Sequence, residues 1–423
     1  LGTPERPKMR PNVKHRFFGF SLVILVFSLV GCASRTQEIR VWTDRIELVT
    51  HSELFNVGDY GFYAVVEYVP SPAEALEQRA DRPDVIVADY LGSSEVMESF
   101  LVLDRRFRRF SPDSRDVYDD LLSHGRLRGR QRLYPISFDL PGVLSLAETA
   151  EELPDFTIDI DELRERGGAF NQTESGRLTR LGYSPRWSRE FLYTLVRMLG
   201  VRFFEGPEGL PEWDGAELQS AVEHAREWIE ETNQGLEAER MFQEQYLYDP
   251  MPQLVLRERV LFSYIRASDF FSMPETRRRN FDIRWLSRDG KIPVLESMVF
   301  AGVVADSRNK QASLEFVSWL ASAETHREIL VNAEKRRLGS FGVLGGFSAH
   351  RETNEWFLPE LYPSLLGIMP PGETLSFPGT VPDSWDLLKA QVVEPWLSRA
   401  IDGHPGLGSL DSLVESWMLQ KGD

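Results

Sequence analysis

Arg82-Pro83-Asp84-Val85-Ile86-Val87-Ala88-Asp89-Tyr90 is the stretch that decides the fold class of this chain. Its four central residues are apolar without a break, whereas a strand with one face in water alternates apolar and polar residues. An unbroken apolar run is typical of a strand that is buried on both faces of a parallel sheet. We therefore expect a central strand here, with helices packed on both of its sides.

The residues before this strand predict two more strands and two helices. Glu38 to Asp44 alternates apolar and charged side chains, and Tyr63 to Val69 is rich in β-branched and aromatic residues. An irregular helix is expected around Glu47 to Val57. Another helix begins at Ser71-Pro72, because proline is tolerated in the first helical turn. Strands that alternate with helices in this order predict an α/β fold.

Polar and aromatic side chains follow two of these strands. Trp42, Thr43 and Asp44 come at the end of the first strand, and Asp89 and Tyr90 end the third. Ligands of open α/β sheets bind beyond the carboxyl ends of the strands, so these five residues are candidate ligand contacts. The alternative is that Trp42 and Tyr90 are ordinary packing and the aspartates ordinary helix caps, and the sequence leaves both interpretations open.

A specific resemblance starts at Gly129-Arg130-Gln131-Arg132-Leu133-Tyr134-Pro135-Ile136-Ser137-Phe138-Asp139-Leu140-Pro141-Gly142. This turn and extended segment resembles a stretch of the bacterial extracellular solute-binding proteins of the sugar-binding, maltose-binding-protein-like class. In that family the pattern G-K-x-Y-G-x-P-x-x-x-D marks the first crossing between two lobes. Val41-Trp42 and Pro83-Asp84-Val85-Ile86 are similar to other landmarks of the family, whereas Arg130-Gln131-Arg132 departs from its shorter Gly-Lys turn.

The second half of the chain continues the resemblance. Phe300 to Ala323 is the best single match, because a strand, a polar turn with Asn309-Lys310 and a helix follow as they do in the family. We expect a polar loop from Phe170 to Tyr183. Further helices are expected from Pro185 to Gly200, Asp214 to Ile229, Ser384 to Ile401 and Leu410 to Leu419, and further strands at Glu258–Tyr264 and Phe281–Leu286.

The resemblance implies an α/β, two-lobed periplasmic-binding-protein fold (type II), in which each lobe is a sheet flanked by helices and three crossings join the lobes. The first lobe would hold residues 38–138 plus 298–340, and the second residues 140–296 plus 346–423. The first crossing would be Ile136 to Leu140, and the third, rich in glycine, would lie near Leu338 to Phe347. The expected ligand contacts are Trp42, Thr43, Asp44, Asp89, Tyr90, Ser137, Phe138, Asp139, Tyr183, Trp187, Tyr264 and Phe300.

The N-terminal residues predict export and a lipid anchor. Basic residues, among them Lys8, Arg10, Lys14 and Arg16, precede an apolar run of 14 residues from Phe17 to Val30, which is shorter than the about 20 that a membrane-spanning helix needs. Leu29-Val30-Gly31-Cys32 resembles the lipobox of bacterial lipoproteins, in which the cysteine is acylated, for example with palmitate, and becomes the new N-terminus. We expect a signal peptide at 1–31, a lipidated tether at 32–37, and a protein tethered to the periplasmic or extracytoplasmic face of a membrane. Cys32 is the only cysteine, so no disulfide is expected.

Charge and motifs exclude several classes of function. Removal of a leader with five Lys/Arg and one Glu takes the formal net charge from −17 to −21, which repels phosphate backbones and makes nucleic acid an improbable partner. The seven histidines are widely spaced, and no H-E-x-x-H, G-x-S-x-G elbow, Walker loop or dinucleotide fingerprint stands after a strand. We expect no enzyme activity, no cofactor and no metal site.

The resemblance implies a monomeric binding protein that delivers a small solute to an ABC-transporter permease. Aromatic residues make up 11% of the chain, and sugar rings rest their C–H faces on such side chains, which favours a carbohydrate ligand. A polyamine or another organic solute is the alternative ligand, since an acidic surface would suit it. A lipoprotein with this fold that signals or adheres is the alternative class, and a secreted glycosidase is a third, because carboxylate pairs are plentiful.

Overall fold

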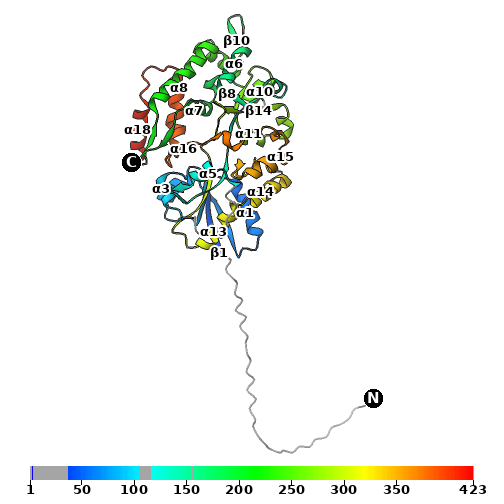
Figure 1. Ribbon diagram of the computed structural model, residues 1–423, viewed down its shortest axis with the longest axis vertical. Coiled ribbons are helices and arrows are strands. Elements are labelled where there is room, and N and C mark those ends of the chain that lie inside the picture. Colours follow the sequence, from blue (N-terminus) through cyan, green and yellow to red (C-terminus); the bar gives the residue numbers. More distant parts are fainter. Residues whose placement is uncertain (1, 3–36, 104–115, 155, 423) are drawn as a thin grey trace, which may run out of the picture. The chain divides into compact units, whose positions relative to one another are not determined.

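A computed structural model of the chain describes residue 2 and residues 37–103, 116–154 and 156–422 (Figure 1). The predicted signal peptide and the lipid-anchor residue Cys32 lie outside these described residues. The chain from Gln37 onward forms one compact unit. This unit contains two main sheets, each with its own set of helices, and we call each sheet with its helices a lobe.

The first lobe is built on a six-stranded sheet. All four residues of the central strand β3 (Val85–Ala88) are buried, which confirms the expectation from its unbroken apolar run. β3 runs parallel to β1, β1 runs parallel to β2, and β16 pairs antiparallel with β3 and β6. The strand order is β17 (Phe347–Ser348), β6 (Tyr134–Phe138), β16 (Val299–Val303), β3, β1 (Gln37–Thr43) and β2 (Phe62–Tyr68). Its helices are α1 (Glu47–Val57), α2 (Pro72–Gln78), α3 (Ser94–Glu98), α5 (Asp119–His124), α13 (Lys310–Leu320) and α14 (Ala323–Arg336).

The second lobe is built on a four-stranded sheet. Strand β7 pairs antiparallel with β13 and β14, and β8 runs parallel to β14. The order is β13 (Ser263–Arg266), β7 (Pro141–Leu146), β14 (Phe281–Ser287) and β8 (Thr157–Asp159). Its helices are α6 (Ile160–Phe170), α7 (Arg189–Met198), α8 (Gly215–Glu227), α9 (Leu236–Tyr246), α10 (Met251–Leu256), α11 (Ala267–Ser272) and α12 (Glu275–Arg278).

The C-terminal helices belong to the second lobe. The structure confirms helices in the expected tail, as α16 (Trp385–Leu388), α17 (Glu394–Ile401) and α18 (Leu410–Gly422). Helix α17 packs on α7 and α8. Trp385 and Leu397 share one apolar core with Phe191 and Leu195 of α7, so burial of this shared surface holds the tail in place. Figure 1 shows α16 and α18 beside α7 and α8.

The lobes are joined by three passages of the chain. The first is Asp139-Leu140, between β6 and β7. The second follows β15 (Ile292–Pro293) and leads into β16. The third runs through β18 (Leu375–Ser376), which pairs parallel with β15. Two extended crossing segments therefore lie side by side.

The third passage is not where the sequence predicted it. Gly342, at φ 62°, turns the chain so tightly that a Cβ there would meet the carbonyl oxygen of Gly346. The chain then returns to the first sheet, where β17 pairs with β6. The expected crossing near Leu338 to Phe347 is therefore wrong, because these glycines serve a tight turn and not an extended connection. β17 also lies within the range 346–423 that we assigned to the second lobe, whose other boundaries stay predictions.

Two smaller expectations differ from the structure. The expected loop at 170–183 contains a hairpin of β9 (Gln172–Glu174) and β10 (Arg177–Arg180), whose turn residues Ser175 and Gly176 both have positive φ, as two-residue hairpin turns require. The expected strand from Glu258 begins only at Ser263, because Glu258, at φ 50°, ends α10 in a left-handed turn. The described residues also form the short strands β4 (Arg126–Leu127), β5 (Arg130–Gln131), β11 (Phe203–Glu205) and β12 (Pro211–Trp213) and the helix α15 (Leu358–Leu361).

Candidate functional site

Asp44, Arg45 and Asp89 form a charged cluster at one edge of the first sheet. β1 and β3 are parallel neighbours, so the residues that follow them meet. Arg45 Nε lies 3.2 Å from Asp44 Oδ1, a second nitrogen of Arg45 contacts Asp89, and the Asp89 amide donates to Asp44 Oδ2 at 3.2 Å. Burial, and next the charge of Asp89, raise the pKa of Asp44 to about 9. The sequence placed both aspartates here and missed the arginine between them.

Tyr90 continues this edge into a buried network that ties the lobes together. Its φ of 48° is unusual for a residue other than glycine, and strained backbone of this kind is found where the surroundings fix it. The Tyr90 hydroxyl accepts a hydrogen bond of 2.8 Å from Lys389 Nζ, which lies 3.3 Å from Glu296 Oε2. Trp385 Nε1 donates to Glu296 at 3.0 Å, and the Tyr193 hydroxyl donates to its other oxygen.

The members of this network come from four separate segments. Tyr90 follows β3, Glu296 lies on the second crossing, Tyr193 is on α7, and Trp385 and Lys389 belong to the C-terminal region. Burial works against the charge of Lys389, but Tyr90, Glu296 and Tyr193 raise its pKa well above the ordinary value. Burial likewise opposes ionisation of Glu296, yet Lys389 and Arg197 keep its pKa below the usual range. Both side chains are therefore charged and depend on each other.

The residues predicted on the first crossing are structural. Ser137 and Phe138 are buried, and the ring of Phe138 packs against Tyr118 and Phe347. Asp139 accepts hydrogen bonds from the Leu140 amide at 2.8 Å, the Ser268 amide at 3.1 Å and the Ser268 hydroxyl at 2.5 Å. These donors occupy the carboxylate that we expected to bind ligand hydroxyls. Through these hydrogen bonds Asp139 connects the crossing to the start of α11.

Asp139 gives a pH-dependent prediction. Burial raises its pKa from 3.8 to about 7, so between these pH values the folded protein binds a proton that the unfolded chain has lost. The contribution of Asp139 to the free energy of unfolding therefore falls as pH rises through this window. Asp139→Asn keeps an acceptor for both amides and cannot ionise. We therefore expect the free energy of unfolding of Asp139→Asn, taken relative to that of the wild type, to increase by up to about 4 kcal/mol between pH 4 and pH 8.

Urea denaturation at several pH values measures this difference. Asp161→Asn is a matched control, because the side chain of Asp161 is 62% exposed. A stability difference between Asp139→Asn and the wild type that stays constant from pH 4 to pH 8 would contradict the assignment.

The second lobe contributes its own polar and aromatic groups near the ends of β13 and α7. Arg266 ends β13 and donates to Glu190 Oε1 of α7 at 2.6 Å. The partly buried Tyr264 packs its ring edge-on against Phe191. Trp187 is partly buried and stacks on Phe242 at 6.1 Å between ring centroids, whereas Tyr183 is buried within the core.

Asp386, in α16, is a further acidic group of the second lobe. Burial raises the pKa of Asp386, and the charges of Lys389, Asp89, Arg45 and Arg266 act on it too. Asp89 and Arg45 come from the first lobe, while Asp386 and Arg266 come from the second. The sequence missed Arg45, Glu190, Arg266, Asp386, Lys389 and Glu296, although the position of Arg266 two residues after a predicted strand was an available signal.

The remaining predicted residues serve packing or turns. Trp42 has no exposed surface, donates to Glu67 at 3.0 Å and carries the guanidinium of Arg79 above its ring at 4.4 Å. The Thr43 hydroxyl accepts a hydrogen bond from the Arg45 amide at 3.0 Å and shapes the turn after β1. Phe300 is buried and, with Tyr90 and Glu296, lines a cavity of about 30 Å³, which has room for about one water molecule.

The described part of the chain contains neither a candidate metal cluster nor a helix that could span a membrane. Among its residues, no group of three His, Cys, Asp or Glu side chains is placed to hold a metal ion. None of its helices combines the length and the apolar character that crossing a bilayer requires.

Comparison with solved structures identifies the fold. No protein-family model matches the chain, and no curated protein matches its sequence. The sugar-binding protein MalE from Xanthomonas citri superposes with a TM-score of 0.64 at 15% identity, over 90% of this chain and 95% of that one. This chain has the two-lobed fold of solute-binding proteins.

Two more structures share this solute-binding fold. An ABC substrate-binding protein from Listeria monocytogenes, in complex with cycloalternan, has a TM-score of 0.62 at 12% identity. The superposition covers 90% of this chain and 97% of that one. A cyclic alpha-maltosyl-1,6-maltose binding protein from Arthrobacter globiformis has a TM-score of 0.60 at 15% identity, over 89% and 96% of the two chains. Identities this low establish the solute-binding fold, and the ligand has to be argued from the residues of this chain.

Proposed function

We propose that the protein captures a small carbohydrate between its lobes and delivers it to an ABC-transporter permease. The observation that carries the proposal is that the charged cluster of Asp44, Arg45 and Asp89 in the first lobe adjoins Tyr90, whose hydroxyl accepts a hydrogen bond of 2.8 Å from Lys389 of the second lobe. Proteins with the same fold are named or described as binding cycloalternan, a cyclic maltosyl-maltose, α-D-tagatose and ribitol. Their ligands are all rich in hydroxyl groups.

Carboxylates and guanidinium groups suit such ligands, because each sugar hydroxyl both donates and accepts. Hydrogen bonds to charged groups contribute about 1.5–3 kcal/mol each. Asp44, Asp89 and Arg45 would bind from the first lobe, and Glu190 and Arg266 from the second. The rings of Tyr90, Tyr264 and Trp187 would support the apolar faces of the sugar. A ligand that contacts both lobes only when they approach each other shifts the protein to a closed form.

A ligand screen tests this proposal. Mono- and oligosaccharides are added to the purified protein, and its thermal unfolding is followed. A sugar at 100 times its dissociation constant should increase the free energy of unfolding by about 2.7 kcal/mol, which shifts the unfolding temperature measurably. Recovery of the sugar unchanged after incubation supports binding over hydrolysis. If a polyamine stabilises the protein and no sugar does, the carbohydrate assignment is wrong and the ligand is a polyamine.

The proposed lipid anchor has its own test. Acylation at Cys32 would hold the protein on the membrane face where a permease can accept the solute. Cys32→Ala should abolish incorporation of labelled fatty acid and leave either uncleaved precursor or protein released from the membrane. Because Cys32 is the only cysteine, no other thiol can take over the attachment. Labelling of the variant at the wild-type level would refute the anchor.

A further inference from the structure

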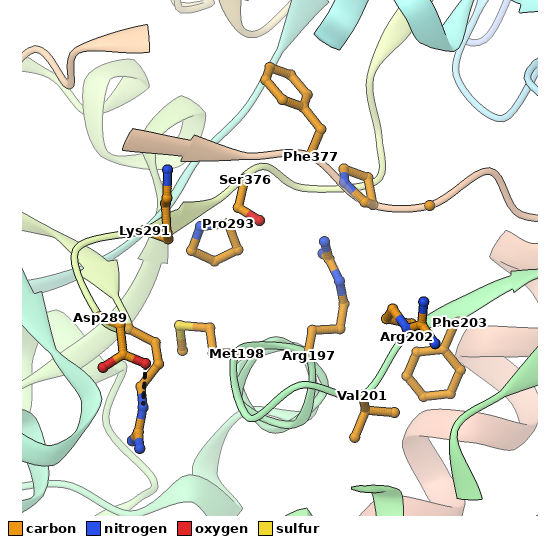
Figure 2. A pocket seen from close by; sticks show the side chains of 13 residues that line it. Arg197, Met198, Val201, Arg202, Phe203, Asp289, Lys291, Pro293, Ser376 and Phe377 are labelled. Atoms are coloured by element: carbon orange, nitrogen blue, oxygen red, sulfur yellow. Dashed lines mark ion pairs between the residues drawn. The ribbon is translucent and has the colours of Figure 1, made fainter. Parts of the chain in front are cut away.

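A cavity of about 300 Å³ lies beside α7 in the second lobe (Figure 2). It is bounded by the C-terminal end of α7, the residues after it, the turn between β14 and β15, and the segment that begins in β18. Its lining residues are Arg197, Met198, Val201, Arg202, Phe203, Arg288, Asp289, Lys291, Pro293, Ser376, Phe377, Pro378 and Gly379. None of these residues belongs to the proposed sugar site.

The charge of this cavity is opposite to that of the protein. Four of its lining residues are cationic and one is anionic, in a chain whose formal net charge is −17. Figure 2 shows the guanidinium of Arg197 pointing from α7 into the space between the helix and the strand that carries Ser376 and Phe377. Arg197 also donates to the Val294 carbonyl at 3.3 Å, which fixes its direction.

Acidic partners offset part of this positive charge from outside the cavity. Arg202 pairs with Asp214 at 2.8 Å, and Arg288 pairs with Asp161 at 3.0 Å, neither of which lines the cavity. Asp289, which does line it, lies 3.7 Å from Arg288. Glu296 lies 3.9 Å from Arg197 but is shared with Lys389.

Lys291 is the exception among these cations. Its ammonium donates to the Glu373 carbonyl at 2.7 Å, and within the described residues no carboxylate lies within 4.0 Å of it. A carbonyl oxygen satisfies one of the three donors of an ammonium group and does not neutralise its charge. Lys291 therefore has charge and donors available to a ligand.

The cavity also has an apolar side. Met198 and Pro293 present aliphatic surface to the same space as the cations, whereas the rings of Phe203 and Phe377 pack elsewhere, near Trp385 and Phe138. A volume of about 300 Å³ is at the lower end of cavities that hold small organic molecules and exceeds what an inorganic oxyanion needs. We propose that this cavity is a second binding site, for a small organic anion that joins a phosphate or carboxylate group to an apolar body.

Phenyl phosphate is a suitable probe, because it joins a dianionic group to an aromatic ring. Calorimetric titration of the purified protein at constant ionic strength should show one site with a dissociation constant below about 1 mM. Benzyl alcohol, which has the ring without the charge, and inorganic phosphate, which has the charge without the ring, should each bind at least 10-fold more weakly. No heat of binding with phenyl phosphate, or equal affinity for inorganic phosphate, would overturn the proposal.

Variants locate the site. Lys291→Gln should weaken phenyl phosphate about 10-fold or more, because it removes a charge-assisted hydrogen bond. Arg202→Gln should weaken it in the same direction and leave the fold intact, because the Arg202 side chain is 76% exposed. Lys335→Gln, on the exposed side of α14 in the other lobe, is the matched control and should leave the affinity unchanged.

Equal affinities in all three variants would place the ligand elsewhere and refute the assignment. Failure of this site would leave the sugar proposal untouched, since the two share no residue.

Discussion

Glu296→Ala is expected to lower the free energy of unfolding by about 3–5 kcal/mol, as removal of one partner of a buried ion pair does. The substitution leaves the buried ammonium of Lys389 without its carboxylate. It also takes the acceptor from Trp385 Nε1 and from the Tyr193 hydroxyl. These groups come from α7 and from the C-terminal region, and the carboxylate on the second crossing holds the two segments together. Urea denaturation followed by tryptophan fluorescence measures the change.

Two comparisons make this prediction specific. Glu237→Ala removes a carboxylate that is 69% exposed and pairs with Arg240, so its cost should stay below about 1 kcal/mol. The double variant Glu296→Leu and Lys389→Met removes both charges at once and should be more stable than Glu296→Ala alone, because no charge is left buried without a partner. Equal stability of Glu296→Ala and Glu237→Ala would show that the network does not hold the lobes.

The fold could be predicted where the pattern is local. The apolar run from Val85 to Ala88 is itself the signal of a strand covered on both faces, and the structure buries all four of its residues. The helix from Lys310 to Leu320 likewise shows its apolar spacing in the sequence and buries Phe316 and Val317. Such elements depend on residues a few positions apart, so one sequence is enough to find them.

The third crossing was misplaced because glycine has more than one use. A glycine-rich stretch is compatible with an extended connection and with a tight turn, and composition does not distinguish them. The turn at Gly342 is decided by β17, whose two residues find partners on the edge of β6. That pairing joins residues more than 200 positions apart, and no local sequence pattern predicts it.

The site was predictable only in part for the same reason. Asp44 and Asp89 could be found, because the ends of neighbouring parallel strands meet by construction. The hydrogen bond between Tyr90 and Lys389 joins residues 299 positions apart, and nothing near Lys389 distinguishes it from an exposed lysine. Trp42 and Asp139 are residue types that often contact ligands. In this structure Trp42 is hydrogen-bonded to Glu67, and Asp139 is hydrogen-bonded to Ser268.

Loss of the Arg266 side chain should weaken sugar binding about 10- to 100-fold, the equivalent of about 1.5–3 kcal/mol for a hydrogen bond to a charged group. Arg266 is 44% exposed in its side chain and pairs with Glu190, which is also partly exposed, so Arg266→Gln should change the free energy of unfolding by less than about 1 kcal/mol. Calorimetric titration with the sugar found by the ligand screen measures the loss. Arg240→Gln is the matched control, since Arg240 is exposed and pairs with Glu237 and Glu244 of its own helix.

Scattering separates weaker binding from lost closure. Two lobes joined by extended segments can rotate with little change in their cores, because the backbone change falls on a few residues. The three hydrogen bonds of Asp139 keep that residue with the second lobe, so the bend in the first crossing should fall before it. Saturating sugar should therefore lower the radius of gyration of the wild type in small-angle X-ray scattering. Arg266→Gln should reach the same closed value at a higher sugar concentration, because it lacks one contact and keeps every crossing. An unchanged radius of gyration with sugar bound would rule out closure, and wild-type affinity of Arg266→Gln would remove this residue from the site.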